Sequence, residues 1–405
     1  MTSAAPPFRV NRNLRLLYLL GLLTMSQPGL AIWVVYLLDF RDLTLTQIGV
    51  MEAFFWGVKL LIEVPSGAIA DRFGRRATFW VGLVIEGSGV AMFAFASSFP
   101  ILLVSYVLWS GGLSFRSGND QAYLYDALAA GDRAEEFSTR TGVYGALTTT
   151  AFTLSGIVGA WLAAVTTLQL PMILGVVPFL LAGICLALMQ EPPRVIGTAA
   201  HLPYAQTLRA AFNVLRTNRP VRYALLVQIF VTTGLGASFL LAQPFLQEHG
   251  VDLALFGLLQ APSMLAGAAA SILSARVAHR LGVYRLAAVT IALTIGGLLV
   301  VAAVDDVVAF AGIITVQIGV GAATPALTGY VNNRTESNIR ATMMSVVPLG
   351  TSITFALTGP FAGTIGDSSI RLAFAAMAVV ILLSAGASLL LWRRAERIPL
   401  EVAPR

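Results

Sequence analysis

Twelve long apolar runs restrict the fold of this sequence more than any other feature. They occupy residues 15–38, 46–70, 76–98, 100–128, 138–164, 168–190, 220–246, 253–279, 283–304, 307–331, 339–366 and 369–392. Each run exceeds the roughly 20 residues that an α-helix needs to cross the hydrocarbon core of a bilayer. Charged residues make up only 11% of the chain, against about 25% in soluble domains. The sequence therefore predicts an all-α polytopic membrane protein with twelve transmembrane helices.

The distribution of basic residues predicts the orientation, because Lys and Arg accumulate on the cytoplasmic side of a membrane protein. With the N-terminus inside, the outward segments carry only Arg41 and Arg371, while Arg116 and Lys59 lie within runs. All other basic residues then face inward, which also explains the net charge of +6 without a nucleic-acid partner. We expect a multi-pass protein of the cell (cytoplasmic) membrane with both termini in the cytoplasm.

One long polar interval, residues 191–219, divides the runs into two sets of six. Within it, apolar residues from Tyr204 to Leu215 recur at helical spacing. We interpret them as one face of an amphipathic helix on the cytoplasmic membrane surface; a partly ordered linker is the alternative. The predicted domains are an N-terminal six-helix bundle at 1–193, a cytoplasmic linker with this helix at 194–218, and a C-terminal six-helix bundle at 219–405. A weak repeat, GAIADRFG at 67–74 and ARVAHRLG at 275–282, supports a six-plus-six duplication.

A polar stripe lies within the second run. Its members, at the spacing of one helix face, are Glu52, Trp56, Lys59 and Glu63. Ionisable residues in a membrane span are costly and mark functional sites. Glu63 is the first candidate for proton coupling, with a pair to Lys59 that protonation would break; a permanent structural ion pair is the alternative. Glu52 is a further coupling candidate, and it could instead line an entrance or lie at a solvated helix end.

A segment rich in glycine and arginine ends the same run. It reads GAIADRFGRR, and its defining positions are Gly67, Asp71, Arg72, Gly74, Arg75 and Arg76. The pattern G-x-x-x-D-R-x-G-R-[KR] between the second and third spans resembles the signature of the major facilitator superfamily. The topology of the whole chain is similar as well. The resemblance implies the six-plus-six fold of a secondary transporter that works by alternating access.

Asp71 occupies the C-terminal, negative end of its own helix, where an acid is unfavourable. We therefore expect a stabilising partner elsewhere, and the resemblance implies the start of span eleven, Asn338–Thr342. Asp126, at the end of span four, is expected to pair with the arginines, while Gly67 would allow close helix approach and Gly74 a tight turn. These residues would form a latch that keeps the cytoplasmic side closed while the transporter faces outward. A loop that is basic only because it faces inside is the alternative.

A second resemblance lies in the fourth run, where Trp109–Asp120 reads WSGGLSFRSGND. Its arginine, Arg116, partly matches the proton-coupling motif of the same family. Arg116 and Asp120 are one helical turn apart and could pair, and Arg116 could favour the ionised form of a nearby carboxylate; a static ion pair is the alternative. Glu86, in the third run, is a weaker coupling candidate, expected more as a packing partner for a basic group on a neighbouring span.

The resemblance also implies that spans one, four, seven and ten line the transport cavity. Candidate lining residues are Gln27, Tyr36, Trp109, Gln228, Thr232, Gln243 and Gln317. A mainly apolar cavity with few fixed charges suits hydrophobic or weakly cationic compounds. Glutamines that only join neighbouring helices are the alternative.

These features predict proton-coupled efflux of small amphipathic or hydrophobic compounds, of the multidrug type. The fifth run keeps Gly156 and Gly159 of the antiporter signature but lacks its proline, which weakens this interpretation. An importer or metabolite carrier of the same fold, or a transport-inactive sensor, is the alternative. We expect no enzyme, since the sequence has no nucleophile elbow or HExxH motif, no metal site, and no cofactor beyond a proton gradient. The expected partners are membrane lipid and a small-molecule substrate, for a monomer.

Overall fold

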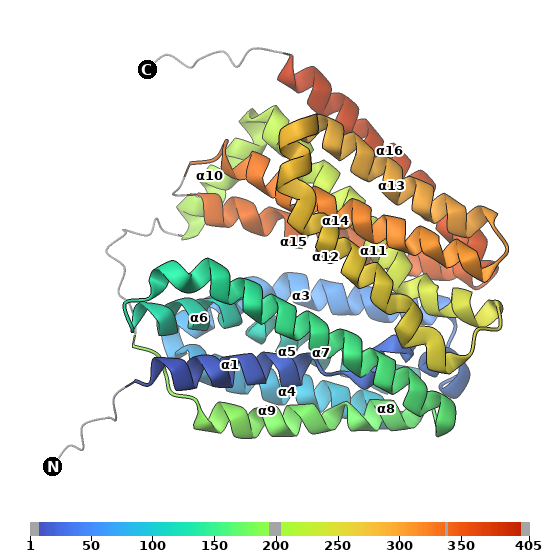
Figure 1. Cartoon of the computed structure of the whole chain (residues 1–405), viewed down its shortest axis with the longest axis horizontal. Helices are drawn as coiled ribbons and strands as arrows, with labels where there is room; N and C mark the ends of the chain where they lie inside the picture. The colour runs from blue at the N-terminus through green and yellow to red at the C-terminus, as the bar shows by residue number, and fades with distance from the viewer. Residues whose placement is uncertain (1–7, 194–203, 337–338, 398–405) are drawn as a thin grey trace. The chain divides into compact units, whose positions relative to one another are not determined.

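Helices account for almost all of the secondary structure. The computed structural model describes residues 8–193, 204–336 and 339–397, and within these ranges the chain forms helices joined by short turns, without strands (Figure 1). Eleven helical stretches in the described ranges are long and apolar enough to cross a membrane. They correspond to the second through twelfth predicted runs. The prediction of an all-α polytopic membrane protein is confirmed, and helices suit this setting because they satisfy every backbone hydrogen bond internally.

The chain divides into two compact units. The first contains Met1–Leu43, Met51–Thr198 and Asp252–Leu258, and the second contains Thr44–Val50, Ala199–Val251 and Leu259–Arg405. Helix α3 (Leu45–Phe73) therefore begins in the second unit and continues in the first. The other helices of the first unit are α1 (Val10–Met25), α2 (Trp33–Val35), α4 (Arg75–Phe95), α5 (Phe99–Arg116), α6 (Asn119–Ala129), α7 (Phe137–Val165), α8 (Gln169–Leu174) and α9 (Val176–Leu188).

The first predicted run, 15–38, is not one continuous helix. Helix α1 begins earlier, at Val10, and ends at Met25; a 3₁₀ turn at Pro28–Ala31, the short α2 and a π-helical turn at Tyr36–Phe40 follow. Pro28 has no N–H to donate to a helix and its ring obstructs the preceding turn. The prediction of a single long helix is therefore wrong at this point, and the stretch consists of separate short segments.

The fourth predicted run, 100–128, is also interrupted. Helix α5 ends at Arg116, and α6 starts at Asn119 after a turn in which Gly118 has φ +76°. This left-handed conformation costs glycine almost nothing, whereas a side chain would make it unfavourable. The break separates Arg116 from Asp120, although the two are only four positions apart in the sequence.

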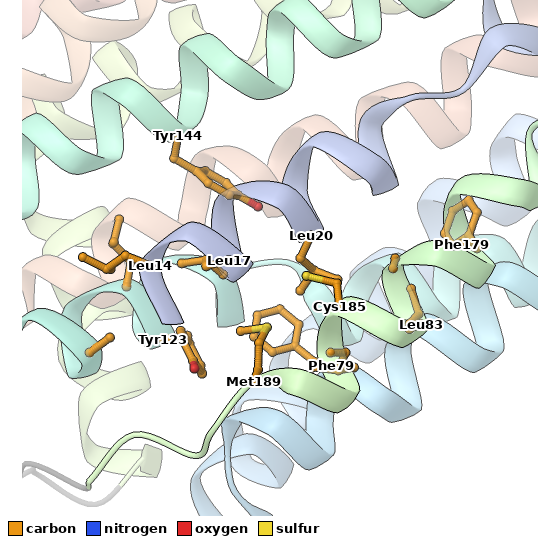
Figure 2. Close-up of a cluster of buried hydrophobic side chains, with 14 of the residues drawn as sticks. Leu14, Leu17, Leu20, Phe79, Leu83, Tyr123, Tyr144, Phe179, Cys185 and Met189 are labelled. Atoms are coloured by element: carbon orange, nitrogen blue, oxygen red, sulfur yellow. The ribbon is translucent and has the colours of Figure 1, made fainter. Parts of the chain in front are cut away.

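A buried apolar cluster packs α6 against four other helices of the first unit, α1, α4, α7 and α9. Leu14, Leu17 and Leu20 recur on one face of α1, and Figure 2 shows them directed toward side chains of other helices. The same cluster includes Phe79 of α4, Tyr123 of α6, and Cys185 of α9. Because these side chains are withdrawn from solvent, the cluster holds the five helices in one arrangement, and it thereby positions α6.

Helices α4 and α5 make an unusually close contact. A Cβ placed on Gly112 of α5 would lie 2.2 Å from the backbone nitrogen of Glu86 on α4. Only glycine allows two helix backbones to approach so closely in a membrane protein. The contact brings Glu86 directly against α5.

The second unit contains six further helices and the larger part of α12. Its helices are α10 (Tyr204–Thr217), α11 (Arg219–Glu248), α12 (Phe256–Leu281), α13 (Val283–Ala303), α14 (Ala311–Asn332), α15 (Arg340–Gly366) and α16 (Ile370–Glu396). Helix α10 lies in the interval where an amphipathic helix is expected. Its Phe212 side chain is exposed, while the side chains of Tyr204 and Leu208 lie outside the described residues.

The start of α3 is capped from a distant part of the sequence. Asp367, directly after α15, accepts hydrogen bonds from the backbone nitrogens of Leu45 (2.6 Å) and Thr46 (3.1 Å). It also accepts one from the hydroxyl of Thr46. The first N–H groups of a helix have no partner within the helix, and a carboxylate at that end is favourable. Asp367 therefore fixes the first turn of α3 within the second unit.

Candidate functional site

A buried ion pair joins α4 and α5 in the first unit. Arg116 donates from Nε to Oε2 of Glu86 at 2.6 Å and from Nη2 to Oε1 at 3.2 Å. The two side chains are 2% and 1% exposed. This fork-to-fork geometry satisfies both carboxylate oxygens. Such a pair is tolerated away from water only when its hydrogen bonds are made this completely.

A third helix completes the surroundings of Arg116. Its remaining terminal nitrogen, Nη1, donates to the hydroxyl of Thr24 on α1 at 2.9 Å. That hydroxyl in turn donates to the carbonyl oxygen of Leu20 at 2.9 Å. Arg116 is also the last residue of α5, where the helix dipole favours a cation. The end of α5 thus holds the guanidinium at the meeting point of α1, α4 and α5.

The ion pair that the sequence predicts between Arg116 and Asp120 does not form. The turn at Ser117 and Gly118 interrupts the helix, so the two residues no longer lie one turn apart on a common face. Asp120 instead accepts a hydrogen bond at Oδ2 from the hydroxyl of Tyr144 on α7, at 2.8 Å. Its other oxygen, Oδ1, is buried without a hydrogen-bond partner. Glu86 takes the place that the sequence assigns to Asp120, which agrees with its expected packing against a basic group.

The polar stripe of α3 is arranged differently from the prediction. Trp56 donates from Nε1 to Oε2 of Glu52 at 3.0 Å, and the Lys59 ammonium lies over the Trp56 ring, 5.1 Å from its centroid. Lys59 and Glu63 form no ion pair, and Oε2 of Glu63 is buried without a hydrogen-bond partner. Side chains on a helix point back toward its N-terminus. The lysine consequently reaches the preceding turn, and the predicted Lys59–Glu63 pair is wrong.

Aromatic rings surround the N-terminal part of this stripe. Phe55 makes edge contacts with Trp56, Tyr106 and Trp109 at centroid distances of 5.6, 5.9 and 6.5 Å. Tyr106 and Trp109 are in contact with each other as well, at 6.1 Å. Glu52 therefore lies beside a cluster of aromatic faces contributed by α3 and α5. Helical spacing in the sequence places Glu52 and Trp56 on one face of α3. It does not predict the contacts with α5, because these depend on how the two helices pack.

Three of the predicted cavity residues are buried and form hydrogen bonds inside their own unit. Tyr36 is fully buried, donates to the carbonyl oxygen of Ala94 (3.2 Å) and accepts from Arg41 Nε (2.8 Å). The Gln228 amide donates to Thr328 at 3.3 Å, and that of Gln27 to the carbonyl oxygen of Thr24 at 3.2 Å.

The remaining predicted cavity residues are a mixed group. Gln243 is 1% exposed, and Thr232 donates to the carbonyl oxygen of Gln228 at 2.8 Å. Trp109 and Gln317 are partly exposed. The bond of Gln228 to Thr328 joins α11 to α14 and favours the alternative in which a glutamine joins neighbouring helices, whereas the bond of Gln27 is local; a cavity-lining role stays a prediction.

The arginine-rich segment forms a tight junction at the start of α4. Arg75 donates from Nε to Oδ2 of Asp126 at 3.2 Å, which is the partner that the resemblance implies. Gly74 has φ +97°, a backbone conformation that suits glycine. The Arg76 side chain donates to the carbonyl oxygens of Leu186 (3.2 Å) and Ala187 (2.9 Å) at the end of α9.

Sequence reasoning missed Glu191 in this junction. Its carboxylate accepts from the backbone nitrogens of Arg75 (2.6 Å) and Arg76 (2.8 Å). The only sequence signal is an acidic residue directly after the sixth run, and the sequence does not distinguish it from a solvent-exposed acid in a loop. Arg72 lies over the ring of Phe73 at 5.4 Å.

The expected contact of Asp71 falls outside the described residues. The surroundings of Gly67, the side chain of Asp71 and all of residues 337–338 are among the parts that the structure does not describe. The contact between Asp71 and the start of span eleven stays a prediction.

Comparisons with known proteins agree on one family of transporters. A sequence model described as Major Facilitator Superfamily matches residues 16–338 and 225–404. The uncharacterized MFS-type transporter YxaM of Bacillus subtilis (strain 168) is 25% identical over 224 residues, which cover 54% of each protein. The quinolone resistance protein NorA of Staphylococcus aureus (strain MRSA252) is 27% identical over 159 residues, covering 39% of this chain and 40% of NorA. The matched segment thus spans about half the length of YxaM and less of NorA.

A solved structure resembles the chain over its full length. It is a bacterial homolog of the human lysosomal transporter Spinster in an inward-facing and unoccupied conformation, with a TM-score of 0.77. The match covers 100% of both chains at 17% sequence identity, which is a likeness of fold.

Proposed function

Because the chain belongs to the major facilitator superfamily, we propose that it is a twelve-span secondary active transporter of the drug:proton antiporter type. It exports small amphipathic or hydrophobic compounds by alternating access, and a proton gradient supplies the driving force. It resides as a monomer in the cytoplasmic membrane, with both termini in the cytoplasm. The inward bias of the arginines supports this orientation.

The single observation that carries the proposal is a buried cluster of one cation and two acids. Arg116 is paired with Glu86, and Asp120 interacts electrostatically with both. When both acids are ionised the cluster has one more negative than positive charge, and binding one proton makes it neutral. A buried ionisable cluster in a membrane span is costly and is retained where protons or ions are moved. This composition suits a proton-coupled carrier.

The substrate side of the proposal rests on Glu52 and the rings beside it. A carboxylate next to aromatic faces attracts organic cations, because the face of an aromatic ring is electron-rich. The Lys59 ammonium over the Trp56 ring is an example of such a contact within the chain itself. NorA, one of the relatives, is named for quinolone resistance, which supports export of small organic compounds.

The arginine-rich segment supports the alternating-access part of the proposal. It ties α4 to Asp126 of α6 and to the end of α9. These bonds join α4, α6 and α9 at one end of the first unit, which suits a bundle that rocks as a unit. In the proposed orientation this end faces the cytoplasm.

Transport in proteoliposomes tests the proposal. We expect the purified protein to accumulate ethidium in vesicles with an acidic interior, because outward proton flow would drive inward movement of the compound. Ethidium carries a fixed charge, so acidity alone cannot trap it. The Arg116→Gln variant should lose this accumulation, whereas Arg133→Gln, at a partly exposed ion pair with Glu136, should keep it.

Other outcomes would assign a different function. Uptake driven by an acidic exterior would indicate proton-coupled import of the same compound. A screen for ligands that raise the thermal stability of the protein, repeated at two pH values, adds an independent readout. A sugar or amino-acid ligand would refute export of amphipathic compounds, and the absence of any ligand response together with absent transport would favour a sensor.

A further inference from the structure

We infer that Asp120 is the carboxylate that takes up and releases the coupled proton, and that Tyr144 is the residue that positions it. The inference rests on the proposed proton coupling and assigns that role to one acid of the cluster. The sequence favours Glu63 instead, so the structure changes the order of the candidates.

The hydrogen bonds of Glu86 exclude it as the labile acid. Both of its oxygens accept from Arg116, and both side chains are almost completely buried. Protonation of Glu86 would leave the guanidinium charged and unpaired away from water, which is very unfavourable. The Glu86–Arg116 pair is therefore a neutral unit that stays ionised. Asp120 then carries the surplus negative charge of the cluster.

Asp120 has the features of a group that changes its protonation state. Its Oδ1 is buried without a hydrogen-bond partner, and an ionised oxygen is far costlier in this position than a protonated one. The residue as a whole nevertheless keeps partial exposure, so that a proton can reach it. Asp120 also lies in the first turn of α6, directly after the left-handed Gly118. There the positive end of the helix dipole stabilises the ionised form, so both forms have a source of stabilisation.

Tyr144 is held in place by the shape of α1. Its hydroxyl donates to Oδ2 of Asp120 at 2.8 Å, and Figure 2 shows its ring projecting from α7 toward the part of α1 that contains Leu20. A Cβ on Gly21 would lie 2.5 Å from the ring. Glycine at this position thus creates the space that the ring occupies. The ring therefore packs directly against α1, and its hydroxyl joins α7 to Asp120.

The ionisable groups around Asp120 are few. Arg116 interacts with it from α5 and Tyr144 from α7, while Glu86 on α4, the partner of Arg116, repels its negative charge. On α1, Tyr18 contacts the Tyr144 ring at 6.3 Å. A hydrogen bond to a carboxylate is stronger than one to a neutral carboxyl group. Protonation of Asp120 should consequently loosen the bond to Tyr144, and this would link the proton to the position of α7.

An infrared titration of the purified protein tests the inference without any substrate or gradient. The wild-type difference spectrum should contain a protonated-carboxyl band that is absent in Asp120→Asn. In Tyr144→Phe the midpoint of this band should move to higher pH by about one unit, because the ionised form loses a hydrogen bond. Tyr123→Phe is the matched control: Tyr123 is also buried, but its hydroxyl bonds Asn13 and the carbonyl oxygen of Gln190. It should leave the midpoint unchanged.

Transport measurements complete the test. The pH at which ethidium accumulation is half-maximal should shift in Tyr144→Phe in the same direction as the infrared midpoint, and Gly21→Ala should also shift it. A carboxyl band that persists in Asp120→Asn, or an unchanged midpoint in Tyr144→Phe, would overturn the inference. If the band titrates as expected while wild-type transport does not depend on the proton gradient, the proposed proton coupling is refuted. Asp120 is then only a structural group whose protonation depends on pH.

Discussion

Replacing Glu86 by Gln should destabilise the protein strongly, although the two side chains have nearly the same shape. The substitution removes the charge that balances Arg116, and it replaces one of the two accepting oxygens with an N–H₂ group that faces another donor. Exposure of only 1% and 2% leaves water no way to replace the lost bonds. Breaking a buried ion pair from one side costs about 3–5 kcal/mol, and we expect a loss of this size.

The free energy of unfolding, measured by SDS titration in mixed micelles, provides the assay. Glu136→Gln is the control, because it breaks only partly exposed pairs, with Arg133 and Arg140, and should remain close to wild type. The double variant Glu86→Met with Arg116→Met should recover most of the stability, since a packed apolar pair of similar volume avoids the cost of burying charge. It should nevertheless lose proton-driven transport. A Glu86→Gln variant no less stable than the Glu136→Gln control would refute the reasoning.

Three further predictions concern other residues. Glu191→Ala removes the acceptor of two backbone N–H groups at the start of α4, so the free energy of unfolding should fall by about 1 kcal/mol; an unchanged value would show that the cap is dispensable. Asp367→Ala frees the first two amides of α3, and their hydrogen exchange, followed by mass spectrometry, should become faster while that of α9 stays constant. Equal rates at α3 in both proteins would rule out this cap. Glu63→Gln should keep the pH dependence of ethidium uptake if Asp120 carries the proton, and loss of that dependence would return the role to Glu63.

The apolar runs predict the helices well because membrane spans must be both long and apolar. They do not predict where a run is interrupted. Pro28 lies at a break, whereas Pro65, Pro244 and Pro325 lie inside continuous helices. A proline in a membrane helix is tolerated when neighbouring groups satisfy the freed carbonyl. Whether they do so depends on the tertiary contacts, which the local sequence does not contain.

The sequence identifies the ionisable residues of the site, but it does not predict which of them form pairs. Arg116 is conspicuous in the sequence because few charged residues lie inside the runs. Helical spacing suggests Asp120 as its partner, but the Gly118 turn breaks that relation and the close contact at Gly112 brings Glu86 within reach. Likewise, spacing allows Lys59 to reach Glu63, and the direction of the side chain takes it to Trp56 instead. Periodicity identifies which residues share a face, whereas pairing requires the distances between helices.

The close contact between α4 and α5 has a consequence for the response of the protein to ionic strength. Where the backbone of Gly112 lies against that of Glu86, no mobile counter-ion can enter between the helices. Salt screens exposed charges over about 10 Å at 0.1 M, but it acts much less on buried pairs. The attraction between Glu86 and Arg116 should therefore be the same in dilute buffer and in concentrated salt, while the Arg133–Glu136 pair weakens. A cell whose internal salt concentration varies would keep this pair, and the charge balance that it sets for Asp120, unchanged.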